Sequence, residues 1–322
     1  MPARPDIEAE IHARLFPFPK PHLLGVEDLS PEEALRLLDL ADAFAGLNEL
    51  PRRSLELLKG LTQANLFFEN STRTRSSFEI AGKRLGADVV NLDVATSSTA
   101  KGETLSDTAA TIDAMGCDLM VVRQAGEGSV AEVAGAVKAS VINAGDGKNE
   151  HPTQALLDAL TIRRAFGRLD GLTVAIVGDL RHSRVARSNA RLLPRLGVKL
   201  RMAGPPPLMP ENPVQGVELA DSLDAAVAGA DVVMMLRIQR ERMDASVAPS
   251  PQAYARAWGL NRDRLALAAA GAKVMHPGPM NRDVEMDSTL ADDRNVSLIR
   301  DQVRNGVAVR MAVLASLAAR RA

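Results

Sequence analysis

Hydrophobic residues follow two alternating patterns along the chain. Short apolar runs of the kind found in buried strands alternate with longer segments whose apolar residues return every three or four positions, as on one face of a helix. In the first half the strand-like runs are ANLFFE (64–69), DVVNLD (88–93), CDLMVVR (117–123) and ASVINAG (139–145). Strands alternating with helices predict a parallel α/β sheet between residues 64 and 145.

Capping residues mark where several helices begin and end. In LSPEEALRLLDLADAF, Ser30 suits the N-cap, Pro31 the first turn and Glu33 the third position, which predicts the start of the first long helix. A further helix is expected in KGETLSDTAATIDAMG, ended by Gly116. The apolar stripe of that helix would consist of Leu105, Ala109, Ile112 and Met115.

The second half repeats the alternation and predicts a second α/β domain. Its expected strands are GLTVAIVGD (171–179), VKLRMAGP (198–205), ADVVMMLRI (230–238), GAKVMHPG (271–278) and VSLIRD (296–301). Between the halves, HPTQALLDALTIRRAFG suits a linking helix that Gly167 ends. A last helix should bury one stripe formed by Val307, Met311, Leu314 and Ala318, and we expect it to return to the first domain.

A chain of 322 residues is long enough for two domains at roughly 150 residues each. We therefore predict an α/β fold of two domains, each a parallel sheet flanked by helices, joined by the linking helix. The first would comprise residues 1–151 plus the C-terminal helix 303–322, and the second residues 152–302.

The overall charge is close to neutral, with 39 Lys and Arg against 40 Asp and Glu. No global field attracts nucleic acid or a membrane, so an anion site must come from local clustering. The N-terminal segment lacks the apolar core of a secretory signal, and the longest apolar runs, such as DVVMML, fall far short of the roughly 20 residues that span a bilayer. We expect a soluble, cytoplasmic protein that binds neither nucleic acid nor membrane.

Several kinds of chemistry lack the residues they need. The single cysteine, Cys117, excludes an intramolecular disulfide and a multi-cysteine metal site; it suits a small core residue, with a reactive thiol as the alternative. The chain contains no HExxH motif, no metal-spaced carboxylate cluster and no GxSxG motif. Gly178 follows a strand, but Leu180 and Ser183 stand where a dinucleotide fingerprint needs glycine. We expect no metal, no NAD and no other cofactor.

Polar and cationic residues follow the expected strands, at the sheet edge where ligands of parallel sheets bind. We call the segment that follows a strand its exit. The exits of the first half are NSTRTR, VATSSTAKGE, Arg123 and DGKNEHPTQ, and those of the second half are GDLRHSR, RIQRER and HPGPMNR. Two such edges facing each other across a cleft would bind two polyanionic ligands. The loop at 94–102 exceeds the usual length of about 2 to 6 residues for βα loops, and we expect it to close over the site.

The segment STRTR combines a helix N-terminus with hydroxyl and guanidinium donors, which together suit the oxygens of a phosphate. Phosphate binding is favoured over plain helix capping because four such donors are consecutive: Ser71, Thr72, Arg73 and Thr74. Arg75 could instead point away and form a structural ion pair.

His151 and Gln154 lie three residues apart in the first turn of the linking helix, after glycines that permit close approach of the backbone to a ligand. A lone histidine is more often structural. At a domain junction we favour a role in which His151 donates a hydrogen bond to a carbonyl that becomes an oxyanion.

Arginines at the second-half exits suit a carboxylate ligand. Arg184 could bind one carboxylate, and Arg237 offers a bidentate fork beside the amide of Gln239. Arg240 and Arg242, with Glu241 between them, are interpreted as a solvated face.

Taken in order, FFENSTRTRSSFE, KGETLSDT, NAGDGKNEHPTQALLD, VGDLRHSR, LRIQRERM and MHPGPMNR resemble the catalytic chains of the aspartate carbamoyltransferase family. The resemblance runs from residue 64 to the last helix. STRTR and HPTQ alone mark carbamoyltransferases in general. The ornithine branch carries Ser-Met-Gly and His-Cys-Leu-Pro segments in its second half, where this chain has LRIQRER and HPGP.

The resemblance implies transfer of the carbamoyl group from carbamoyl phosphate to the α-amino group of L-aspartate, in pyrimidine biosynthesis. It implies catalytic roles for Arg73, Thr74, Lys101, Arg123 and His151. The implied carbamoyl phosphate ligands are Ser71, Thr72, Arg73, Thr74, Ser97, Lys101, Arg123, His151 and Gln154. The implied aspartate ligands are Lys101, Arg184, Arg237, Gln239, Pro277, Gly278 and Pro279.

The resemblance also implies an assembly. Ser97 and Lys101 match family residues that reach into a neighbouring subunit's site, which implies a homotrimer with shared active sites. Regulatory or dihydroorotase-like chains could join it in a larger assembly. One departure from the family pattern is Asp283, which stands where glycine is expected.

Two alternatives remain open at this stage. The first is a binding protein or assembly subunit that has kept the fold and lost catalysis; the joint presence of Arg73, Lys101, His151 and Arg237 argues against it. The second is a carbamoyltransferase with another amine acceptor, such as an acylated ornithine.

Overall fold

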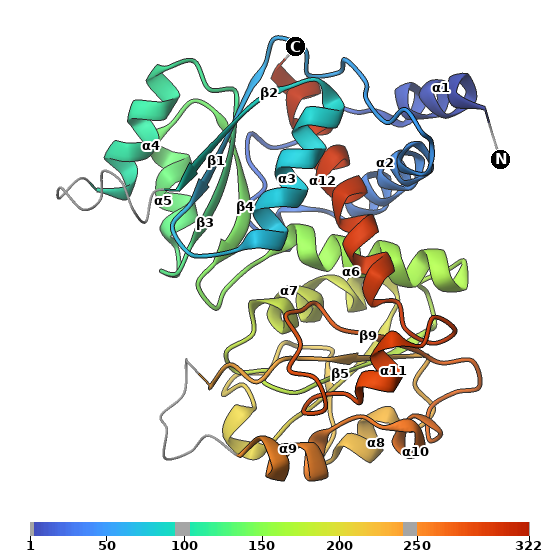
Figure 1. The fold of residues 1–322 in the computed structure, drawn as a ribbon. Coiled ribbons are helices and arrows are strands. Elements are labelled where there is room, and N and C mark those ends of the chain that lie inside the picture. The colour runs from blue at the N-terminus through green and yellow to red at the C-terminus, as the bar shows by residue number, and fades with distance from the viewer. Residues whose placement is uncertain (1–2, 94–103, 241–249, 322) are drawn as a thin grey trace. The chain divides into compact units, whose positions relative to one another are not determined.

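The computed structural model describes residues 3–93, 104–240 and 250–321 of the chain. The chain divides into two compact units: Met1–Leu160 with Arg304–Ala322, and Thr161–Val303. We call these the first and the second unit. Each contains a parallel sheet flanked by helices, which confirms the predicted fold class (Figure 1).

The sheet of the first unit has four parallel strands in the order β2-β1-β3-β4. Their bounds are Thr62–Phe67 (β1), Asp88–Asp93 (β2), Leu119–Gln124 (β3) and Ser140–Asp146 (β4). All four strands were predicted. Phe67 at the end of β1 is in register with Asp93 of β2 and with Arg123 of β3, so the carboxyl ends of these strands meet at one edge.

The helices of the first unit are α1 (Arg4–Arg14), α2 (Pro31–Glu49), α3 (Thr72–Leu85), α4 (Leu105–Ala114) and α5 (Ser129–Ala136), with a 3-10 turn at Val26–Asp28. The predicted start of α2 is confirmed, because the Ser30 side chain accepts a hydrogen bond from the Glu33 N–H. Helix α1 was missed, since its alternating charges and short length give little periodic signal.

The prediction of the apolar stripe of α4 is wrong for one residue, Met115. Ala109 is buried, and Leu105 and Ile112 pack against the core, but Met115 is 75% exposed. It occupies the C-cap position, where the helix has ended and the helical period no longer decides which way a side chain points. Cys117 is buried in the same core, as expected of a small core residue.

The second unit has a five-stranded parallel sheet in the order β7-β6-β5-β8-β9. Its strands are β5 (Thr173–Val177), β6 (Lys199–Ala203), β7 (Glu218–Leu219), β8 (Val232–Met235) and β9 (Lys273–Met275). The prediction of a strand in VSLIRD is wrong. Ser297 forms one isolated bridge with Val274, and the chain enters a helix at Ile299, so this short apolar run is the approach to a helix.

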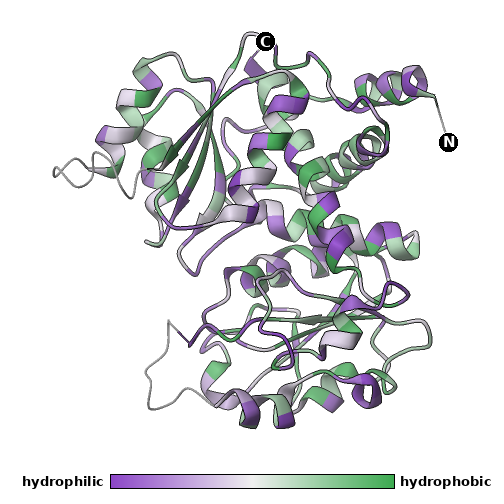
Figure 2. Cartoon of the chain, viewed as in Figure 1, coloured by the Kyte–Doolittle hydropathy of each residue, from purple (hydrophilic) through white to green (hydrophobic). Residues whose placement is uncertain are grey.

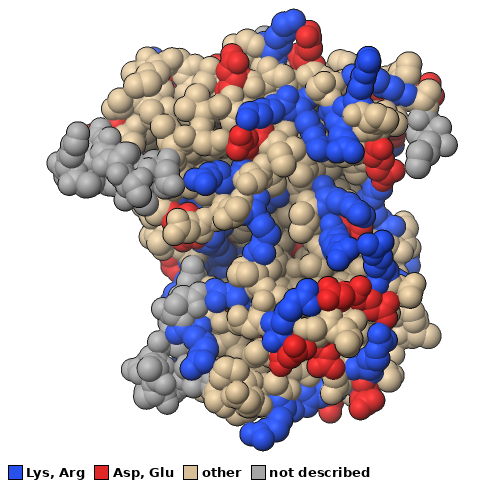
Figure 3. Space-filling model, in the orientation of Figure 1, with Lys and Arg blue, Asp and Glu red and all other residues tan. Residues whose placement is uncertain are grey.

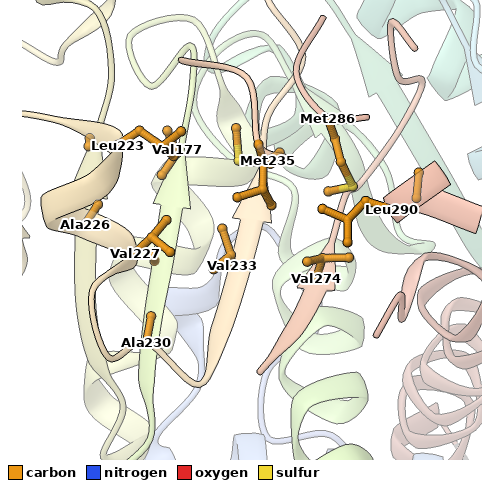
Figure 4. Packing of buried hydrophobic residues seen from close by; sticks show 14 residues of the cluster. Val177, Leu223, Ala226, Val227, Ala230, Val233, Met235, Val274, Met286 and Leu290 are labelled. Carbon is orange, nitrogen blue, oxygen red and sulfur yellow. The ribbon is translucent and has the colours of Figure 1, made fainter. Parts of the chain in front are cut away.

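The helices of the second unit are α7 (Arg184–Leu192), α8 (Leu223–Val227), α9 (Pro251–Trp258), α10 (Arg262–Leu265) and α11 (Ser288–Asp292), with 3-10 turns at Pro194–Leu196 and Pro206–Leu208. Residues of α8, α11 and the segment before α11 pack onto the central strands (Figure 4). Val177, Val233 and Val274 contribute to this core from β5, β8 and β9, which fixes the strands whose ends carry the candidate residues.

Two helices run across the boundary between the units: α6 (Pro152–Phe166) and α12 (Ile299–Arg321). The first is the predicted linking helix, followed by Gly167 at φ 72°. The second is the predicted last helix, but the expected single stripe underestimates its burial, because residues 308–318 are buried on all sides. Hydrophobic colour accordingly covers most strands and much of α12 (Figure 2). None of the described helices is both long enough and apolar enough to cross a membrane.

Candidate functional site

In the first unit, three strand exits with candidate residues lie side by side. Strand β3 is paired with β1 on one side and β4 on the other. The Phe68 N–H, just past β1, donates to the Arg123 carbonyl at 2.9 Å, and Gln124 is in register with Asp146 at the end of β4. The segments that follow β1, β3 and β4 therefore start from the same sheet edge.

The exit of β1 leads directly into α3. Ser71 occupies the N-cap position of α3, but its side chain makes no capping hydrogen bond to the described backbone. Thr72 and Arg73 are exposed, whereas Thr74 is 8% exposed at the start of the helix. The Ser71 hydroxyl therefore does not cap α3, which was the alternative interpretation of this segment.

Arg75 has a local electrostatic role on α3. The pKa of Glu79 is lowered by a hydrogen bond from Lys83, and the charge of Arg75 contributes to the same shift. This contribution fits the structural alternative for Arg75.

Arg123 is held at the sheet edge by two interactions. Its guanidinium donates to the Ala144 carbonyl at 3.2 Å and forms an ion pair with Glu69 at 2.5 Å. Both side chains are largely buried, at 13% and 18% exposed. The sequence analysis missed Glu69, which directly precedes the NSTRTR exit, because nothing in the chain indicates which neighbouring exit its side chain faces.

His151 and Gln154 stand where β4 leads into α6. His151 is 4% exposed and precedes the helix, and its carbonyl accepts the Gln154 N–H at 2.9 Å. Gln154 is also buried, at 8% exposed. A Cβ on Gly147, before His151, would lie 2.6 Å from Cγ of Glu127. Glycine at this position therefore lets the loop after β4 pack closely against the Glu127 segment of the same chain.

In the second unit, the candidate arginines follow the adjacent strands β5 and β8. Arg184 is the first residue of α7 and is 7% exposed, and the side chain of the preceding Ser183 caps the helix. Gly178 adopts φ 138°, and a Cβ there would lie 2.7 Å from the Leu236 carbonyl oxygen. Glycine at 178 thus lets the two exits approach each other.

Two buried carboxylates brace the exit of β8. Asp179, which is fully buried, accepts the Gln239 N–H at 3.2 Å and contacts the His182 ring at 2.9 Å. The Gln239 amide donates in turn to the His182 carbonyl at 2.9 Å. Asp179 was missed because its role depends on a partner 60 residues away.

The second carboxylate is Glu285, which is fully buried and whose pKa is raised by burial. It accepts the Ile238 N–H at 3.2 Å and the Asn281 N–H at 2.7 Å. It therefore ties the segment containing Arg237 to the loop after β9. That loop carries the remaining predicted residues, Pro277, Gly278 and Pro279, with a cis bond between the last two.

Some predicted residues fall outside the described part of the chain. These are Ser97 and Lys101, the loop at 94–102, and Glu241 and Arg242. Arg240 is described and exposed, as expected of a solvated face.

Charge is mixed on the surface. Side chains of both signs lie on the viewed face of each unit, with more Lys and Arg than Asp and Glu (Figure 3), although the formal net charge of the chain is −1. Among the described residues, no group of three or more His, Cys, Asp or Glu side chains is placed to hold a metal ion. The candidate groups that the structure describes are donors for anions.

The fold and the candidate residues define the class: a two-domain α/β protein with arginines at the carboxyl ends of the strands of both sheets. Residues 21–164 match the family described as "Aspartate/ornithine carbamoyltransferase, carbamoyl-P binding domain", and residues 170–317 match "Aspartate/ornithine carbamoyltransferase, Asp/Orn binding domain". The chain belongs to the aspartate/ornithine carbamoyltransferase family.

Its relatives carry a more particular name. The chain is 62% identical over 320 residues, 99% of this chain and 96% of the relative, to a protein of Caulobacter vibrioides named aspartate carbamoyltransferase catalytic subunit. A protein of Gluconobacter oxydans with the same name is 60% identical over 295 residues, 91% of this chain and 94% of the relative.

Solved structures agree with these names. The chain resembles aspartate transcarbamoylase from Trypanosoma cruzi in complex with carbamoyl phosphate, with a TM-score of 0.84, 36% identity and coverage of 92% and 95% of the two chains. It also resembles the same enzyme in complex with N-(phosphonacetyl)-L-aspartic acid, with a TM-score of 0.81, 35% identity and coverage of 92% and 94%.

Proposed function

We propose that this protein is an aspartate carbamoyltransferase, which transfers the carbamoyl group of carbamoyl phosphate to the amine of L-aspartate. The observation that carries the proposal is the 62% identity over 99% of the chain to a relative named aspartate carbamoyltransferase catalytic subunit. The arginine-bearing exits support it, because guanidinium groups suit the phosphate of one substrate and the carboxylates of the other.

The first unit would bind carbamoyl phosphate. Ser71, Thr72, Arg73 and Thr74 supply hydroxyl, guanidinium and helix N-terminal donors for the phosphate. The predicted first domain, residues 1–151 with 303–322, would bind carbamoyl phosphate, and the predicted second, residues 152–302, would bind aspartate. The first compact unit extends to Leu160 and so also includes Gln154.

The chemical step needs positioning and charge stabilisation. The neutral amine of aspartate attacks the carbonyl carbon, and a C–N bond forms as the carbonyl becomes an oxyanion. Thr74, Arg123 and His151 donate to that oxygen, and Gln154 binds the carbamoyl amide. The C–O bond to phosphate then breaks, and the departing phosphate takes the amine proton. N-carbamoyl-L-aspartate and phosphate are the products.

The second unit would hold aspartate. Arg184, Arg237 and Gln239 bind its carboxylates, and the Pro277, Gly278 and Pro279 loop shapes the site. The bracing by Asp179 and Glu285 supports this role, because a site gains affinity when its donors are fixed before the ligand arrives.

The wider setting is proposed on the same family basis. The product would enter pyrimidine biosynthesis in the cytoplasm. The active unit would be a homotrimer in which Ser97 and Lys101 of one chain bind carbamoyl phosphate in a neighbour's site and Lys101 also binds aspartate there. Regulatory or dihydroorotase-like chains would be further partners. Sedimentation of the purified chain would test the trimer.

The decisive experiment supplies purified protein with carbamoyl phosphate and, in turn, L-aspartate, L-ornithine or N-acetyl-L-ornithine, and measures phosphate and the carbamoylated product. We expect turnover only when L-aspartate is the acceptor. Turnover with another amine would keep the phosphate site and overturn the assignment of Arg184 and Arg237. Failure with all three would refute catalysis by this chain alone.

A further inference from the structure

The side chain of Gln154 turns back onto its own helix. Its Nε2 donates to Oδ1 of Asp158, one turn later in α6, at 3.0 Å. Gln154 is 8% exposed and Asp158 is fully buried, so water does not compete for this hydrogen bond at the Asp158 end.

A buried cation accompanies Asp158. Arg310 of α12 is 4% exposed; burial lowers its pKa to about 10, and the nearby carboxylate of Asp158 acts in the opposite direction. Its guanidinium also lies over the Phe78 ring of α3, 5.0 Å from the ring centre. Buried charges in proteins are normally compensated by a charge of opposite sign, and Asp158 is the acid whose charge acts on this guanidinium.

The helices involved are packed closely against one another. A Cβ on Gly306 of α12 would lie 2.6 Å from an Arg310 nitrogen and 3.2 Å from Cδ2 of Leu157 on α6. Helices α3 and α6, whose first turns carry the predicted carbamoyl phosphate residues, are thus both in contact with α12 (Figure 1).

An ionised carboxylate can only accept hydrogen bonds, so the group that Gln154 turns toward Asp158 must be its NH₂. Its carbonyl oxygen then points the other way. An amide fixed in this manner offers an acceptor to a ligand, whereas an amide that rotates can offer either an acceptor or a donor.

We propose that Asp158 is a positioning and specificity-determining residue: it holds the Gln154 oxygen toward the acyl group, so that the site selects an acyl phosphate bearing N–H over one bearing a methyl group. This inference rests on the proposed function. Carbamoyl and acetyl phosphate have nearly the same shape, so packing alone separates them poorly, and a fixed acceptor separates them by a hydrogen bond that methyl cannot make.

The test is the ratio of kcat/KM for carbamoyl phosphate to that for acetyl phosphate, with aspartate as acceptor. In both reactions a C–N bond forms, the acyl C–O bond breaks, phosphate leaves and the amine proton is released. Asp158→Asn keeps the size of the side chain but can either donate or accept, so Gln154 is no longer fixed. We expect the ratio to fall about tenfold, the size of one ordinary hydrogen bond. Because it is a ratio, partial unfolding of the variant cancels.

Two further variants separate positioning from a structural role. Arg310→Lys keeps a positive charge beside Asp158 but loses the planar stacking on Phe78, so it should lower the melting temperature and leave the ratio unchanged. Gln154→Leu should lower the ratio at least as far as Asp158→Asn. Adding Asp158→Asn to Gln154→Leu should then lower it no further, because Asp158 acts through Gln154.

An unchanged ratio in Asp158→Asn would overturn the inference, as would an equal fall in Arg310→Lys or additive effects in the double variant. Wild-type turnover with aspartate tests the proposed function separately. If another amine proves to be the acceptor, the same ratios measured with that amine decide the role of Asp158.

Discussion

Asp283 shows how one residue can depart from a family pattern without breaking a loop. Its φ is 62°, in the left-handed region that favours glycine, and among the described residues it is the one non-glycine with positive φ. Aspartate tolerates this region better than most side chains. Its carboxylate also accepts hydrogen bonds from the Ser288 N–H at 2.8 Å and the Ser288 hydroxyl at 3.0 Å, at the start of α11.

Substitutions at 283 should therefore separate two effects. Asp283→Gly loses the carboxylate but adopts the left-handed backbone conformation without strain. Asp283→Ala loses the carboxylate and is strained in that conformation, so we expect the melting temperature of the alanine variant to fall further. The hydrogen bonds from Ser288 lower the pKa of Asp283, so its contribution to stability is present at neutral pH and is lost as the pH falls below its ordinary value, through the lowered pKa. Thermal unfolding followed by circular dichroism checks the order. Equal melting temperatures for the two variants would contradict this account.

His151 is the residue whose proposed role is most directly chemical. We expect His151→Ala to lower kcat by about 10²- to 10³-fold with little change in substrate binding, because an oxyanion donor acts mainly in the transition state. Steady-state kinetics measure the effect, and His12→Ala on the exposed face of α1 is the control. Turnover near the wild-type rate would remove His151 from this role.

At the scale of elements, strand exits and helix starts decide where the candidate residues stand. The predicted strands and the linking helix could be found from apolar runs and capping residues, since these signals are local. The hydrogen bonds that hold the β8 exit could not be found in this way. Gln239 donates to Asp179 and Ile238 donates to Glu285, and both carboxylates lie far away in the sequence. The VSLIRD run shows the same limit: a few apolar residues do not distinguish a strand from the approach to a helix.

A substitution at Gly178 tests whether the exits of β5 and β8 must lie as close together as the structure shows. Gly178→Ala puts a Cβ 2.7 Å from the Leu236 carbonyl at φ 138°, so the Arg237 segment must shift. We expect a loss of about 1 to 3 kcal/mol in the free energy of unfolding and a raised KM for aspartate.

Urea unfolding and kinetics measure these two effects. The control is Gly216→Ala, where φ is 85° and, apart from the adjacent residues, no atom of the described chain lies within 4 Å of the new Cβ. Backbone strain alone should then cost about 1 kcal/mol and leave KM unchanged. The same rise in KM in both variants would show that strain, and not displacement of the exit, is responsible.

At the scale of the whole molecule, the candidate residues divide between two units with separate cores. The groups expected to bind phosphate follow β1, β3 and β4 of the first unit, and Arg184 and Arg237 follow strands of the second. Sequence reasoning could assign each exit to its unit, because each strand lies close in the chain to its own helix. It could not supply Glu69 as the partner of Arg123, since that pair forms only when the β1 and β3 exits become neighbours.

This division predicts that damage to one substrate's binding leaves the other's intact. We expect Arg237→Ala to lower kcat/KM for aspartate by at least about 100-fold, since a bidentate carboxylate contact is lost and a ligand charge is left without its partner. Affinity for carbamoyl phosphate, measured by calorimetry without aspartate, should stay within about twofold, because its proposed ligands belong to the first unit. Arg240→Ala, at the exposed end of the same exit, should match wild type in both measurements. Equal losses for both substrates in Arg237→Ala would mean that Arg237 supports the fold of the site and does not hold the acceptor.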